Sequence, residues 1–248
     1  MNYKKYFKKI SVIVLLFFLT STSLIMSYNK GDENKIIKEN SNENMEIAIT
    51  FDDGPHPKET AKILDVLKKY DAKATFFVVG KHVKWYPDSV IRASKEGHEI
   101  GNHTYTHPDI STLSEEQLKT EIKDCENIIM EKTGQKPKVF RPPFGNYNKR
   151  CLEELSKDLG YTVVLWSGVD VRDWQNPSSN QISNKIINNV KPGDIILLHD
   201  YGTENTIKAL DTIIPSLQQK GYKFVTVSEL LDKKIDKLRK IVITLWKN

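Results

Sequence analysis

The sequence predicts an α/β domain built on a largely parallel sheet, either open or closed into a barrel. From Met45 onward, short runs rich in β-branched residues alternate with amphipathic helical patterns, and this alternation is typical of repeated strand–helix units. The chain has 248 residues, which suits one enzyme-sized domain of about 200 residues with short appendages.

The individual elements follow from hydrophobic periodicity and from turn and capping residues. Strands are expected at Glu46–Phe51, Ala74–Val79, Thr162–Trp166, Asp194–Leu198 and Lys223–Val227, with weaker strands near Glu99 and Val139. Helices are expected at Thr60–Tyr70, Asp88–Glu96, Lys149–Leu159, Ile182–Val190 and Thr206–Gln219. A further helix has the clearest boundaries: it begins at the capping box Ser114-Glu-Glu-Gln117, continues along one apolar face from Leu118 to Ile129, and ends at Gly134.

The two ends of the chain differ from the domain expected at 45–231. Residues 1–26 combine a lysine-rich start with an apolar run, which is typical of a signal peptide or an uncleaved signal-anchor. Because no Ala-x-Ala-like cleavage site follows, we favour a transmembrane anchor. Residues 27–44 predict a flexible polar spacer, and residues 232–248 form a basic amphipathic tail.

Lysines before the apolar run favour a cytoplasmic N-terminus, and hence an extracytoplasmic domain tethered to the cell membrane. The domain would be secreted if the helix were cleaved. The net charge of +5 lies at the chain ends: the lysines before the apolar run carry +4 and residues 232–248 a net +4, which leaves −3 elsewhere. We therefore expect no nucleic-acid partner, and we expect a monomer.

Polar residues that could carry chemistry follow the predicted strands. In parallel α/β folds, functional side chains gather where strands end and loops begin. We therefore expect these side chains to share one site. They are Asp52 and Asp53, His103 and His107, Arg141, Asp170 and Asp173, and His199.

A divalent-metal site is the first expectation for this group. His103 and His107 are four residues apart, a spacing that can address one metal from a turn or short helix, although such a pair alone is weak evidence. Asp53 is the best third ligand, because two histidines and a carboxylate leave coordination positions open for water and substrate. The alternative for Asp-Asp-Gly-Pro is a surface turn.

An acid–base pair is the second expectation. Asp52, next to the proposed ligand, would stay free as a general base, and His199 is the natural general acid. Asp173 would orient His199 and raise its pKa. Arg141 could pair with Asp52 and hold it ionised, or it could be a surface cation beside Pro142-Pro143.

These segments resemble the motifs of the NodB-homology polysaccharide deacetylases (carbohydrate esterase family four). The resemblance covers roughly 45–231 and implies a distorted (β/α) barrel. It also implies a zinc-like divalent metal, with Co²⁺ or Ni²⁺ as alternatives, that removes N-acetyl or O-acetyl groups from polysaccharides. The matching segments, in order, are Thr50-Phe-Asp-Asp-Gly-Pro55, His103-Thr-Tyr-Thr-His107, Arg141-Pro-Pro-Phe-Gly145, Asp170-Val-Arg-Asp-Trp174 and Leu197-Leu-His199.

The resemblance implies the roles already assigned to the ligands, base and acid, and it adds a substrate slot. Trp174 and Leu197 would line an apolar slot for the acetyl methyl group. The backbone N–H of Phe144 would face the oxyanion. The family more often has Tyr at this position, so any hydroxyl contact to the sugar is absent here.

Other residues have simpler interpretations. His98 is expected to be a packing histidine, and His56 and His82 are expected to be loop and surface residues. Trp85 and Tyr86 are read as core or helix-entry residues. Export would permit a disulfide between the two cysteines, but Cys125 lies on the apolar stripe of its helix and is expected to be a buried thiol.

The motifs and the export signal together predict a cell-envelope N-deacetylase acting on N-acetylhexosamine polymers, with peptidoglycan preferred over chitin-like glycans. An O-acetyl esterase on xylan or other acetylated glycans is the nearest alternative. A non-catalytic glycan-binding module is a further alternative, but it should have lost a ligand, the base or the acid. A serine hydrolase would need a Gly-x-Ser-x-Gly elbow, which is absent from the sequence.

Overall fold

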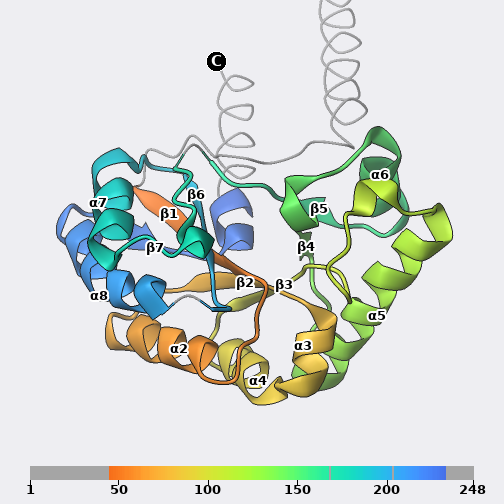
Figure 1. Ribbon diagram of the computed structural model, residues 1–248, viewed down its shortest axis with the longest axis horizontal. Helices are drawn as coiled ribbons and strands as arrows, with labels where there is room; N and C mark the ends of the chain where they lie inside the picture. Colours follow the sequence, from red (N-terminus) through yellow and green to blue (C-terminus); the bar gives the residue numbers. More distant parts are fainter. Residues whose placement is uncertain (1–44, 168, 203, 233–248) are drawn as a thin grey trace, which may run out of the picture. The chain divides into compact units, whose positions relative to one another are not determined.

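Parallel strands form the central sheet of the computed structural model, which describes residues 45–167, 169–202 and 204–232 (Figure 1). The strand order is β5-β4-β3-β2-β1-β6, with β7 also paired to β1, and each pairing is parallel. The predicted parallel sheet is therefore confirmed. The strands are β1 (Glu46–Asp52), β2 (Ala74–Val78), β3 (Glu99–Asn102), β4 (Val139–Phe140), β5 (Thr162–Val163), β6 (Ile195–His199) and β7 (Lys223–Phe224).

The sheet curls into a half-barrel whose edges, β5 and β6, do not pair as strands among the described residues. The strand predicted from Thr162 is shorter than expected, because the neighbouring strand β4 is followed by Pro142, which has no N–H to donate to the carbonyl of Val164. The carbonyls of Val164 and Leu165 accept from the Arg141 side chain instead, both at 3.3 Å. Further along, the backbone N–H of Ser167 donates to the carbonyl of Ile195 at 2.9 Å. The segment after β5 thus approaches β6 at Ser167. The sequence allowed either an open sheet or a closed barrel, and the described strands form a curled half-barrel.

Helices cover the outer face of the sheet (Figure 1). Those of the α type are α2 (Glu59–Lys69), α3 (Gly80–Trp85), α4 (Pro87–Lys95), α5 (Glu115–Thr133), α6 (Lys149–Glu153), α7 (Ser179–Asn189) and α8 (Glu204–Gln219). Short turns complete the pattern, namely η1 (Ile110–Thr112), η2 (Pro143–Gly145), the π-helical η3 (Glu154–Asp158) and η4 (Asp173–Gln175).

Capping explains the best-predicted helix, α5. The Ser114 hydroxyl accepts from the N–H of Gln117, and the Gln117 side chain accepts from the N–H of Ser114. At the other end, Gly134 adopts a left-handed φ of 71°, which glycine reaches at little steric cost. The α3 helix was missed, because a short segment that starts with Gly80 offers no helical period to detect.

Alternation along β1 directs its side chains to two different sides of the sheet. Ile47, Ile49 and Phe51 of β1 pack outward in the main core beneath the helices. The intervening Ala48 faces inward, together with Phe77 and Val139, and residues of the segment after β7 close this inner cluster. Because side chains alternate along a strand, Thr50 and Asp52 share the inner face with Ala48. The inner face of the half-barrel is therefore apolar near the start of β1 and polar toward its end, where Thr50 and Asp52 lie.

Two simpler predictions are confirmed. His98 is buried and accepts from the N–H of Ala74 at 3.2 Å, and burial lowers the pKa of this imidazole to about 4. Cys125 and Cys151 are both free, buried thiols.

None of the helices in the described part of the chain combines the length and apolar character that crossing a bilayer requires. The predicted anchor at 1–26 and spacer at 27–44 lie outside the described residues, as does the tail from residue 233 onward.

Candidate active site

The end of β1 brings adjacent carboxylates to one site. Neighbouring residues on a regular strand point to opposite faces, and Asp52 keeps the inward orientation. Asp53 leaves the strand with a left-handed φ of 75°, directly before Gly54 and a cis Gly54–Pro55 peptide bond. A side chain at position 54 is excluded, since a Cβ there would lie 2.1 Å from Oδ2 of Asp200. The segment is thus the rim of a buried strand, as expected, and not a free surface turn.

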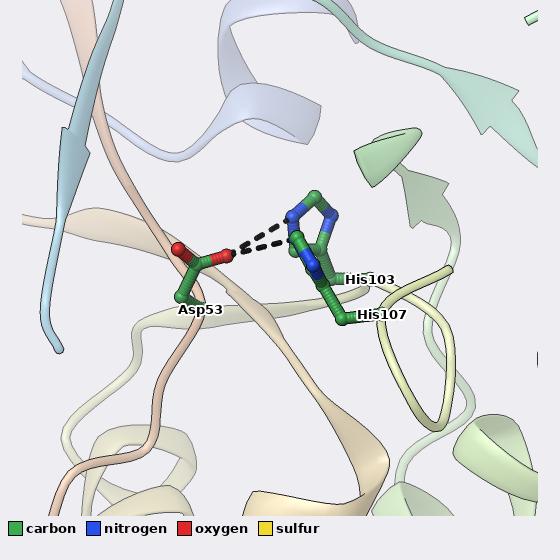
Figure 2. A group of neighbouring side chains, drawn as sticks. All are labelled: Asp53, His103 and His107. Carbon is green, nitrogen blue, oxygen red and sulfur yellow. Dashed lines mark ion pairs between the residues drawn. The ribbon is translucent and has the colours of Figure 1, made fainter. Parts of the chain in front are cut away.

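Asp53, His103 and His107 converge, as predicted (Figure 2). Oδ1 of Asp53 lies 3.1 Å from Nε2 of His107 and 3.5 Å from Nε2 of His103. Ligand atoms bound ~2.1 Å from a tetrahedral cation are about 3.4 Å apart. The donor set and its spacing therefore fit one divalent metal ion.

Hydrogen bonds fix the orientation of these ligands. Nδ1–H of His103 donates to the carbonyl of Arg141 at 2.7 Å, which leaves Nε2 free to bind a cation. The segment between the histidines has left-handed backbone at Thr104 (φ 67°) and His107 (φ 64°). Such strained residues persist only where the surroundings hold them and often occur at functional sites.

Glu121 on α5 holds this segment, and the sequence analysis missed it. Its carboxylate accepts from the N–H groups of Tyr105 and Thr106 at 2.9 and 2.8 Å, and from the Thr106 hydroxyl at 2.6 Å. A single Glu on a polar helix face gives no sequence signal for this role, because its partners become visible only after the fold has formed.

Arg141 is completely buried and pairs with Asp52, so the surface-cation alternative is wrong. Nη1 donates to Oδ1 of Asp52 and to the hydroxyl of Thr50, each at 2.7 Å. The guanidinium also lies over the ring of Phe77, 4.1 Å from its centroid. Oδ2 of Asp52 lies 3.8 Å from Nε2 of His103, so the carboxylate borders the metal-ligand cluster.

His199 and Asp173 form the predicted second pair. Oδ1 of Asp173 lies 2.7 Å from Nδ1 of His199, and Oδ2 accepts from the backbone N–H of His199 and from the Thr206 hydroxyl. Burial opposes a charge on the imidazole, but the Asp173 carboxylate outweighs it and raises the pKa of His199 to about 9. His199 on β6 is the register partner of Asp52 on β1, so acid and base candidates are neighbours on adjacent strands.

The electrostatics of the cluster favour an ionised carboxylate. Burial alone would raise the pKa of Asp53, but hydrogen bonds from His103 and His107 hold it far below its usual range. A carboxylate must be ionised to bind a metal ion. Asp53 is therefore in the state that a ligand needs.

The predicted substrate residues lie near the site without forming a contact that defines a slot. Phe144 is 65% exposed, has a φ of 60°, and packs edge-on against His107 with centroids 4.7 Å apart. Trp174 is 61% exposed on η4, directly after Asp173. Leu197 shares the inner face of β6 with His199. The oxyanion contact of the Phe144 N–H stays a prediction, and Asp170 pairs with the exposed Arg172 instead of joining the cluster.

Comparison with known proteins agrees with this geometry. A family model described as polysaccharide deacetylase matches residues 39–164. The chain belongs to the polysaccharide deacetylase family.

Similar members of the polysaccharide deacetylase family are named as peptidoglycan deacetylases. The chain is 48% identical over 188 residues to a peptidoglycan-N-acetylglucosamine deacetylase of Bacillus cereus, covering 75% of this chain and 87% of that protein. It is 43% identical to the peptidoglycan-N-acetylmuramic acid deacetylase PdaC of Bacillus subtilis, covering 76% of this chain and 39% of that longer protein. These relatives are hydrolases of amide bonds.

The fold is also shared with a solved structure. The crystal structure of the Bc1960 peptidoglycan N-acetylglucosamine deacetylase matches with a TM-score of 0.77 and 36% identity, covering 82% of this chain and 95% of that chain.

Proposed function

We propose that this protein is a metal-dependent N-deacetylase that hydrolyses the N-acetyl groups of N-acetylhexosamine residues in peptidoglycan. One observation carries the proposal. Asp52 and His199 occupy paired positions on adjacent strands beside the ligand cluster, each bound to its own buried partner, Arg141 and Asp173. A decayed, non-catalytic module would not be expected to keep every one of these contacts.

Asp53, His103 and His107 would hold the metal ion. Two imidazole nitrogens and one carboxylate oxygen suit Zn²⁺, with Co²⁺ and Ni²⁺ as alternatives. When bound, a divalent cation would polarise the acetyl carbonyl and lower the pKa of water.

Asp52 would act as the general base. Arg141 binds its Oδ1, so Oδ2, which faces the His103 side of the cluster, is the oxygen that would accept a proton from water. Proton transfer by a positioned group typically contributes ~10²–10⁴-fold.

His199 would act as the general acid. With a pKa of about 9 it is protonated at neutral pH. Because Nδ1 is bound to Asp173, the proton on Nε2 would go to the leaving nitrogen. An amine leaves poorly without a proton, whereas an ester alkoxide needs less help, so this pair favours N-acetyl over O-acetyl substrates.

The substrate contacts and location extend the proposal. Phe144, Trp174 and Leu197 would surround the acetyl group, with the Phe144 N–H facing the oxyanion. The names of the similar proteins from Bacillus cereus and Bacillus subtilis support peptidoglycan. The segment 1–26, in which lysines precede an apolar run, would anchor the protein in the membrane. The spacer at 27–44 would then hold the domain outside the membrane, within reach of the cell wall.

A chelation experiment tests the function. Acetate and free amine are measured after incubation of the protein with purified peptidoglycan, before and after metal removal and after addition of Zn²⁺, Co²⁺ or Ni²⁺. We expect chelation to abolish both products and metal to restore them. Undiminished release after thorough chelation would reject the metal site, and release from O-acetylated xylan but not from peptidoglycan would assign the protein to the esterases.

A further inference from the structure

A row of aromatic rings lies beside the ligand cluster and has no role in the mechanism above. His82 stacks on Tyr201 with centroids 4.8 Å apart and an interplanar angle of 15°. Trp85 lies next to His82 at 5.7 Å, and His56 meets Tyr201 edge-on at 5.0 Å. We call these residues the aromatic row; they come from α3, the segment after β6 and the segment after β1.

The aromatic row is joined to the ligand segments by hydrogen bonds. Nδ1–H of His82 donates to the carbonyl of the ligand Asp53 at 2.7 Å. At the start of α3, the N–H groups of Gly80 and Lys81 donate to the carbonyls of Thr104 and Tyr105, at 3.0 and 2.9 Å. The row is therefore held at a fixed distance from both ligand segments.

The largest rings of the row face solvent. Trp85 is 52% exposed and Tyr201 is 42% exposed, so the core alternative for Trp85 is wrong. Lys81 lies over the indole, with Nζ 4.9 Å from the ring centroid, which helps to hold the ring in place. A single exposed aromatic residue needs no explanation, but a stacked row gathered at the loop end of the sheet differs from scattered exposure.

A pyranose ring is the ligand that suits this surface. One face of an N-acetylhexosamine presents mainly C–H groups, which are apolar and carry slight positive charge. Aromatic faces are apolar and carry the negative part of the ring quadrupole, so the two surfaces pack favourably. The hydroxyl and amide groups of the sugar would stay in contact with water.

We propose that the aromatic row is a second sugar-binding subsite, which holds a pyranose ring of the same glycan chain at a distance from the residue that loses its acetyl group. This inference rests on the proposed function, since it assumes a polymeric N-acetylhexosamine substrate. The subsite makes the enzyme selective for chains over single sugars, because only a chain reaches the row and the cluster together.

The test compares substrates of different length. Trp85→Ala and Tyr201→Ala are assayed for acetate release from a hexamer of N-acetylglucosamine and from the single sugar. Losing one stacked ring should lower kcat/KM on the hexamer about 5- to 10-fold, mainly through KM, with a much smaller change on the single sugar. Met130→Ala removes an exposed apolar side chain on α5 and is the matched control, with both values unchanged.

A binding readout separates this inference from the proposed function. Each substitution is repeated in an Asp52→Asn background, and co-sedimentation with insoluble peptidoglycan is measured without turnover. Weaker sedimentation of the Trp85 and Tyr201 variants supports the subsite. Unchanged sedimentation, or an equal fall in kcat/KM on both substrates, overturns it. If the unmodified protein releases no acetate from peptidoglycan or from the hexamer, the proposed function fails, and sedimentation alone then decides whether the row binds glycan.

Discussion

Arg141 Nη1 lies 2.7 Å from Asp52 Oδ1, in a place where the guanidinium has no exposed surface and the carboxylate very little. Three further N–H groups of Arg141 donate to the Thr50 hydroxyl and to the carbonyls of Val164 and Leu165. A buried ion pair adds little stability compared with an apolar pair, but removal of one partner leaves an uncompensated charge. The pair should therefore be far more sensitive to single than to double substitution.

Arg141→Met should lower the free energy of unfolding of the metal-free protein by ~3–5 kcal/mol. Adding Asp52→Asn to this variant should recover part of the loss, because the buried carboxylate is then neutral. Both values come from urea denaturation followed by circular dichroism.

Arg92→Met is the matched control for this cycle. Arg92 Nη2 lies 2.8 Å from Oδ1 of Asp65, but the Arg92 and Asp65 side chains are 32% and 69% exposed, and exposed pairs contribute about 0–1 kcal/mol. If the double variant at positions 141 and 52 is no more stable than Arg141→Met alone, the charge argument is wrong and the loss comes from packing.

Substitutions of the adjacent residues Asp52 and Asp53 should impair the enzyme in different ways. Asp53→Asn replaces an ionised metal ligand with a weaker neutral one, so metal content measured by mass spectrometry should fall along with activity. Asp52→Asn keeps the shape of the side chain but removes the base, so metal content should stay near that of the unmodified protein while kcat falls by ~10²-fold or more. Equal metal loss in both variants would contradict the assignment of separate roles.

Glu121→Gln should weaken metal binding although residue 121 touches no metal ligand atom. Its carboxylate holds the segment between the histidine ligands through the N–H groups of Tyr105 and Thr106. Substitution of such supporting groups typically lowers metal affinity by 10–100-fold, and competition with a chromogenic chelator measures it.

Glu116→Gln, an exposed position on the same helix, is the control for this experiment and should leave the metal affinity unchanged. An unchanged affinity in Glu121→Gln would show that the left-handed backbone at Thr104 and His107 is maintained by other contacts.

The sequence could predict those parts of the molecule that depend on local pattern. The helix α5 was predicted because its capping box and Gly134 act within a few residues. The ligand cluster was predicted because parallel strands bring their ends together, so that Asp53, His103 and His107 could be combined without knowing the fold in detail.

Features that depend on tertiary contacts were not predictable. The carbonyls of Val164 and Leu165, beyond the end of β5, accept from the side chain of Arg141, which lies more than 20 residues away in the sequence. Glu121 and His82 support the ligands through backbone groups, and backbone partners leave no mark in a residue pattern.

The pH dependence of turnover tests the pairing of His199 with Asp173. A general acid works in its protonated form, which is fully present below its pKa and is lost as the pH rises through it. Asp173 is the main cause that raises the pKa of His199 to about 9, with smaller contributions from Asp52 and Asp53, and burial opposes them. In Asp173→Asn the largest of these raising effects is lost, so the fall of kcat at high pH (its alkaline limb) should move to lower pH, toward the ordinary histidine value of about 6.5. A bound cation lowers this pKa in both proteins, so the comparison between them carries the test. Asp170→Asn, an exposed carboxylate in the same segment paired with Arg172, should leave the limb in place. A limb that stays fixed in Asp173→Asn, in protein whose thermal midpoint shows it to be folded, would mean that a group other than His199 delivers the proton.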